Sequence, residues 1–159
     1  MPKTKPFVIA DALLEAYATS NRITRYLVEN LADEAWRAET PGGKGRTIAA
    51  IVAHIHNVRA MWLKAAGGEH LEPLEPNTAR RAEALDALAR SYQALHRLLA
   101  ASLAGDGRIK GFRPDAAGFV GYLLSHDAHH RGQIAMLARQ SGYPLPQKVM
   151  FGMWEWGSR

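Results

Sequence analysis

The sequence predicts an all-α fold, a four-helix bundle that forms a single domain. Its 159 residues are enough to bury one hydrophobic core without stabilising cross-links. Four long segments carry apolar residues at helical spacing, and glycine and proline mark the breaks between them. No internal repeat or low-complexity tract divides the chain further, so we expect one domain over residues 1–159.

The first two helices are expected over about residues 9–31 and 47–66. The apolar face of the first is formed by Ile9, Leu13, Tyr17, Leu27, Val28 and Leu31. Ser20 and Thr24 fall on this same inner face. The second helix follows the loop TPGGKGRT, in which Thr47 is the expected N-cap, and it ends at AAGG. The loop lacks the spacing of a phosphate-binding GxxxxGK[ST] motif, so its glycines are interpreted as turn residues.

The third and fourth helices are expected over about residues 78–103 and 115–140. The third follows the proline-containing connection GGEHLEPLEPN. Asp115 is the expected N-cap of the fourth, which ends at SGYPLP. The remaining tail is too short for another bundle helix, and its Trp154 and Trp156 are expected to fold back onto the domain.

Composition narrows the function classes. The chain has no cysteine, so disulfides and thiolate ligands are excluded, and a transition-metal site would need histidine and carboxylate. The formal net charge of +5 comes from scattered basic residues without a recognised binding motif, so no nucleic-acid partner is expected. The sequence shows neither a signal-peptide pattern nor a long enough apolar span, so we expect a cytoplasmic protein with no membrane partner.

Three histidines lie within five positions of the fourth helix, in the stretch LLSHDAHHRGQIAML. At about 100° per residue, a helix places His126 and His130 on its apolar side and His129 at the edge of that side. The apolar side is defined by Phe119, Leu123, Ile134 and Leu137. The pair one turn apart is therefore predicted to face the bundle interior.

The second helix supplies the candidate for a third ligand. His54 and His56 are two residues apart, so they lie on nearly opposite sides of it. His54 flanks the apolar side, whereas His56 is predicted to face solvent. Two imidazoles one turn apart and a third from a facing helix can hold one ion, which indicates a metal site at His54, His126 and His130 with one position left for water. The alternative is that these are hydrogen-bonded core histidines without an ion.

Other polar residues leave alternatives open. His96 lies on the apolar face of the third helix, so it is either a rival third ligand or a hydrogen-bonded core residue. Asp127 directly follows His126 and so points about 100° away from it around the helix. It is therefore not expected to bind the same ion. Arg131 is predicted to be a surface or interface residue, and Gly132 to mark the close approach of a neighbouring helix. Ser20, Thr24 and Asn57 are polar groups that could reach the cavity, although packing or solvent exposure would also explain them.

Two stretches taken together, IAAIVAHIHNVRAMW in the second helix and HDAHHRGQI in the fourth, resemble the DinB/YfiT-like superfamily of metal-dependent enzymes. The resemblance spans nearly the whole chain. It implies a bundle of up-down-down-up topology, frequent homodimers, and one divalent ion, often nickel or zinc, held by three histidines. Carried onto this sequence, the ligands fall on His54, His126 and His130, and His96 has no role.

The better-understood relatives in this superfamily are thiol-dependent enzymes, namely mycothiol-dependent maleylpyruvate isomerase and bacillithiol S-transferases. The resemblance implies a hydrolase or a low-molecular-weight-thiol S-transferase acting on a small-molecule substrate. No catalytic group is expected beyond the metal-bound water. The alternative is a non-catalytic metal- or ligand-binding module of a stress response. A DNA-binding stress protein, suggested by the basic charge and the damage-inducible name of the family, would show salt-dependent binding to duplex DNA.

Overall fold

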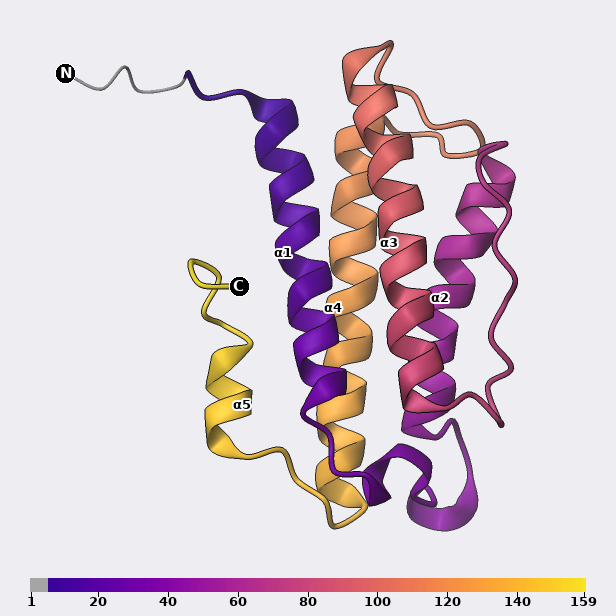
Figure 1. Cartoon of the computed structure of the whole chain (residues 1–159), viewed down its shortest axis with the longest axis vertical. Coiled ribbons are helices and arrows are strands. Elements are labelled where there is room, and N and C mark those ends of the chain that lie inside the picture. The colour runs from indigo at the N-terminus through magenta and orange to yellow at the C-terminus, as the bar shows by residue number, and fades with distance from the viewer. Residues whose placement is uncertain (1–5) are drawn as a thin grey trace, which may run out of the picture.

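The computed structural model describes residues 6–159, which form a bundle of four long helices with a short fifth helix beside it (Figure 1). No β-strand occurs within this range. The helices are α1 (Ile9–Glu29), the short 3₁₀ turns η1 (Glu34–Arg37) and η2 (Pro41–Gly43), α2 (Ile48–Ala65), α3 (Arg81–Ala104), α4 (Ala116–Gln140) and α5 (Gln147–Gly152). The predicted all-α bundle is confirmed.

The long connection between α2 and α3 determines the topology. The helices α1 and α4 run in one direction and α2 and α3 in the other, so α2 and α3 are parallel neighbours in an up-down-down-up order (Figure 1). A tight turn cannot join parallel helices, and residues 66–80 therefore run back along the whole length of α2. Each of α1 and α2 packs against both α3 and α4.

Side-chain caps begin two of the four long helices. The Thr47 hydroxyl accepts a hydrogen bond from the Ala50 amide at 3.2 Å, and the Asp115 carboxylate accepts one from the Gly118 amide at 2.8 Å. Both predicted N-caps are confirmed, because each satisfies an amide that the first helical turn leaves without a partner. The third helix begins at Arg81, a few residues later than expected.

The core consists of two apolar clusters, one at each end of the bundle. One surrounds Leu27 and Ile55 and the other surrounds Tyr17 and Phe119. Buried polar side chains lie between them at the middle of the four helices: Asn21, Arg59, Ser91 and Asp127. This polar layer lies beside the functional site described below.

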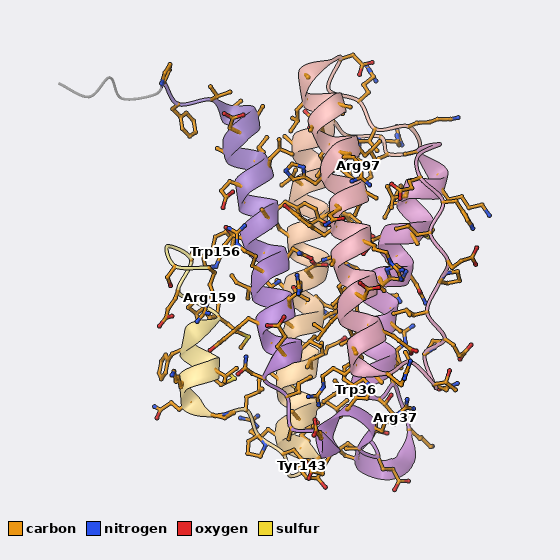
Figure 2. The ribbon with its side chains drawn as sticks, in the orientation of Figure 1. Trp36, Arg37, Arg97, Tyr143, Trp156 and Arg159 are labelled. Atoms are coloured by element: carbon orange, nitrogen blue, oxygen red, sulfur yellow. The ribbon has the colours of Figure 1, made fainter. Side chains whose placement is uncertain are left out.

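The chain after α4 folds back along α1 (Figure 1). Val149 is buried, and the Arg159 guanidinium lies 3.8 Å from the centre of the Tyr26 ring, so the end of the tail is attached to α1 (Figure 2). The two tail tryptophans are less covered than expected, since Trp154 is 78% exposed and Trp156 is 44% exposed. No helix within residues 6–159 is both long and apolar enough to cross a membrane.

Candidate metal centre

Three histidine rings from two antiparallel helices converge on one point. His54 of α2 and His126 and His130 of α4 each offer a ring nitrogen, and these three atoms lie within 4.8 Å of one another. The Nε2 atoms of His126 and His130 are 3.2 Å apart. The centroid of the His54 ring lies 5.4 Å from that of His126 and 4.8 Å from that of His130. The structure thus brings together the three residues that the sequence indicated.

Burial favours the neutral form of two of these imidazoles, those of His54 and His130. Burial, together with Arg46 and the other two histidines, lowers the pKa of His54 to about 4. Burial also lowers the pKa of His130. A neutral imidazole has a free nitrogen lone pair, which is the form that binds a metal ion. Three imidazole nitrogens around one point match the ligand set of a divalent transition metal, so the residues present fit a metal ion.

The two cluster histidines of α4 each have a polar group beside the outer ring nitrogen. The Nδ1 atom of His130 is 2.8 Å from the Gln133 side-chain oxygen, which orients Nε2 toward the cluster. The Nδ1 atom of His126 is 3.6 Å from an Asp127 oxygen, too far for a hydrogen bond but close enough for charge to act. Asp127 is therefore not among the three converging donors, but it lies directly beside one of them.

Asp127 belongs to a buried ion pair with Arg59 of α2. The two side chains are 0% exposed and 2.6 Å apart. The other Arg59 amino group donates to the Asn21 side-chain oxygen at 2.9 Å and the Leu88 carbonyl at 3.2 Å. Although burial alone would raise it, the Arg59 guanidinium holds the pKa of Asp127 below its usual value. This pair connects the middle of all four helices to the histidine cluster.

Two cavities adjoin the cluster. One, of about 250 Å³, is lined by His54 and Asn57, and the other, of about 360 Å³, is lined by Gln133. Both are also lined by Arg46, from the loop that precedes α2, and Lys44 lines the larger one. No described residue lining either cavity carries a carboxylate or a thiol. The walls near the histidines are therefore basic or neutral.

The other histidines lie outside the cluster. The prediction that His56 faces solvent is wrong, because His56 is buried and its ring nitrogens lie 3.0 Å from the carbonyl oxygens of Ala87 and Glu72. Its side of α2 is covered by α3 and by the 66–80 connection, which no helical periodicity could reveal. His96 contacts the Tyr92 ring and takes no part in the cluster, and His129 is exposed.

The polar candidates for supporting roles have other partners. The Asn57 side chain binds the backbone of Leu74, donating to its carbonyl and accepting from its amide, and so fixes the 66–80 connection. The hydroxyls of Ser20 and Thr24 accept hydrogen bonds from Arg131 at 3.0 and 2.9 Å. Arg131 is predicted to be a surface or interface residue, and the surface alternative is wrong, since the residue is half-buried and its side chain turns inward to α1.

The reason expected for Gly132 is also wrong. A Cβ atom added there would meet nothing within 4 Å, so no neighbouring helix approaches it closely. The buried Arg59 and Asn21 were not among the sequence candidates. Arg59 lies one helical turn after Ile55 and one turn before Leu63 on the buried side of α2. A charged residue among these apolar positions is the feature of the sequence that could have indicated a buried ion pair.

Comparison with known proteins agrees with the fold. The sequence profile of the DinB family matches residues 1–155. A crystal structure of a DinB-like protein from Bacillus cereus ATCC 10987 shares the architecture with a TM-score of 0.69 and 22% sequence identity. That match covers 86% of this chain and 95% of the other. No curated protein matches the chain.

Proposed function

The chain belongs to the DinB family, and from that premise we propose that it is a metal-dependent enzyme with one divalent ion, nickel or zinc, at His54, His126 and His130. The observation that supports this most directly is the convergence of three ring nitrogens within 4.8 Å. The lowered pKa of His54, about 4, adds support, because that ring needs no deprotonation to bind an ion at neutral pH.

The reaction proposed is hydrolysis or transfer of a low-molecular-weight thiol. When bound, a divalent ion on three neutral imidazoles keeps its double positive charge, so it can polarise a substrate oxygen or bind a thiolate. The chain contributes binding and orientation around it. Arg46 lines both adjoining cavities and Lys44 lines the larger one, and these charges favour a substrate with negative charge. Gln133 accepts from His130 and so keeps that ring directed at the cluster.

Metal content tests the ligand assignment. We expect elemental analysis of the purified wild-type protein to find close to one nickel or zinc ion per chain, and His126→Ala and His130→Ala to lose most of it. His129→Ala is the matched control, because this exposed histidine lies on the same helix between the two. Undiminished metal in both His126→Ala and His130→Ala would remove the basis of the proposal.

A second measurement separates an enzyme from a non-catalytic metal-binding module. Thermal unfolding with and without a chelator is compared with turnover of activated esters and of epoxides, the latter with mycothiol or bacillithiol. An enzyme shows turnover that stops when the chelator removes the ion. A large loss of stability without any turnover would instead favour the binding module.

A further inference from the structure

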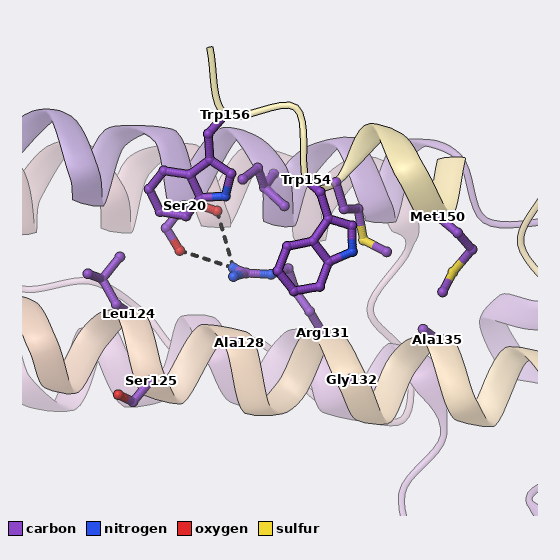
Figure 3. A pocket seen from close by; sticks show the side chains of 12 residues that line it. Ser20, Leu124, Ser125, Ala128, Arg131, Gly132, Ala135, Met150, Trp154 and Trp156 are labelled. Carbon is purple, nitrogen blue, oxygen red and sulfur yellow. Dashed lines mark hydrogen bonds between the residues drawn. The ribbon is translucent and has the colours of Figure 1, made fainter. Parts of the chain in front are cut away.

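A third cavity, of about 480 Å³, lies between α1, α4 and the tail (Figure 3). Its walls come from three parts of the chain, and its lining includes Ile23 of α1, Ala128, Gly132 and Ala135 of α4, and Trp154 and Trp156 of the tail. Along the helix, Ala128 is about 200° from His126, and Gly132 is about 200° from His130. The cavity is therefore separate from the candidate metal centre.

Small residues of α4 leave the cavity open. Ala128, Gly132 and Ala135 follow one another at helical spacing on the face that the tail covers. A Cβ atom at position 132 would meet nothing within 4 Å, although this glycine has an ordinary helical backbone. The glycine therefore provides space within the cavity. A volume of about 480 Å³ falls in the range that small organic ligands occupy.

One charged side chain reaches this otherwise mostly apolar cavity. Arg131 extends from α4 toward α1, and one of its amino groups donates to Ser20 (Figure 3). The same amino group also donates to the Thr24 hydroxyl. Within residues 6–159 its second amino group and its Nε form no hydrogen bond, and no carboxylate lies within ion-pair distance of it, so that the Asp127 charge acts on it only at longer range. A partly buried guanidinium in this state offers two parallel donors to a carboxylate.

We propose that this cavity binds a small organic monocarboxylate, with the carboxylate on Arg131 and an apolar body against Trp154 and Trp156. A single cation matches a single negative charge, and the apolar walls match a body without further polar groups. This site goes beyond the proposed function, because it contains none of the three histidines and needs no metal ion.

Octanoate and its neutral analogue octanol test the proposal. Binding is followed by tryptophan fluorescence, since two of the four tryptophans line the cavity. We expect octanoate to bind the wild-type protein at least about tenfold more tightly than octanol, because a hydrogen bond to a charged group contributes that much. Arg131→Gln should remove this difference. The result should be the same before and after treatment with a chelator, which keeps it distinct from the metal-site tests.

A second variant fills the cavity without touching the charge. Gly132→Leu should abolish octanoate binding while the protein stays folded, because the new side chain enters open space. Gly121→Leu is the matched control, as an added Cβ there also meets nothing within 4 Å and the residue does not line the cavity. Equal affinity for octanoate and octanol, or undiminished octanoate binding to Gly132→Leu, would overturn the proposal. So would a dimer that excludes octanoate and dissociates in Gly132→Leu, since a second copy would then occupy the cavity.

Discussion

Two arginines lie inside this bundle, and their surroundings differ. Arg59 is completely buried, and Asp127, Asn21 and Leu88 all accept hydrogen bonds from it. Among the described residues, 6–159, Arg131 is partly buried and bound only to oxygens of α1, without a carboxylate. A buried charge that is paired with a carboxylate belongs to the architecture, whereas one without an ion-pair partner leaves room for a ligand.

The same helix separates the two environments. Asp127 and Arg131 each follow a histidine of the cluster by one residue, so each turns about 100° away from that ring. Asp127 stays beside the cluster and anchors it to the polar layer through Arg59, while Arg131 reaches the opposite cavity. A single helix can therefore support a candidate metal centre on one side and a ligand cavity on the other.

The largest effect is expected from Asp127→Ala. This change leaves the Arg59 charge buried without its counter-ion, and we expect the free energy of unfolding to fall by about 3–5 kcal/mol. Urea unfolding of the metal-free protein measures it. The double variant R59M/D127L is the control, because removing both charges should restore much of the loss. If Asp127→Ala lowered the stability by less than about 1 kcal/mol, the pair would not have the structural role given to it here.

Arg131→Met tests the second arginine of the comparison, and it should lower the free energy of unfolding much less than Asp127→Ala does. Within residues 6–159 the arginine forms hydrogen bonds to hydroxyl and carbonyl oxygens only, so we expect a loss of about 1.5–2 kcal/mol in the same unfolding experiment. Methionine keeps the apolar part of the side chain, which limits the loss of packing. A loss as large as that of Asp127→Ala would show that both arginines are structural.

Much of the fold and the three-histidine cluster followed from the sequence because both depend on helical phase. The apolar pattern fixes which way His126 and His130 point, and antiparallel packing of α2 brings His54 to them. The partners of Arg59 and Arg131 could not be derived in this way. Periodicity tells which side of a helix a residue faces, but the groups that meet it there come from other helices.

His56 and Gly132 show the same limit. The polar side of α2 is covered by residues 66–80, a segment without any periodic pattern, so a position that looked solvent-facing is buried. Gly132 borders a cavity that exists only because the tail folds back over α4. Both features depend on the path of irregular segments, which the periodicity of a single helix does not predict.

The pH dependence of the free energy of unfolding distinguishes the Arg59–Asp127 pair from His54 beside it. Arg59 holds the pKa of Asp127 below its usual value, so that pair stays charged in mildly acidic solution. His54 binds a proton at about pH 4 in the folded chain but near its ordinary value of 6.5 when unfolded. Between these values the unfolded state takes up more protons, and the stability contributed by neutral His54 is lost as the pH falls from 6.5 to about 4.

The stability lost through protonation of His54 is on the order of 1 kcal/mol, because solvent around the partly exposed ring screens the effect. Urea unfolding of the metal-free wild type and of His54→Ala across this range isolates the contribution. The wild type should lose more stability than the variant as the pH falls. Parallel curves for the two proteins would show that the environment of His54 does not shift its titration.

The smallest effect is expected from Gly132→Ala, and it has the opposite sign. If this glycine only leaves a cavity open, an added methyl group meets no neighbour and gains the helical preference of alanine, about 0.5–1 kcal/mol. The same change at Gly118, where the Cβ would lie 2.9 Å from a Pro114 carbon, should stabilise less or destabilise. Thermal and urea unfolding measure both. If Gly132→Ala were less stable than the wild type, another protein surface would contact α4 at position 132, where the cavity is described. That surface would then also cover the guanidinium of Arg131.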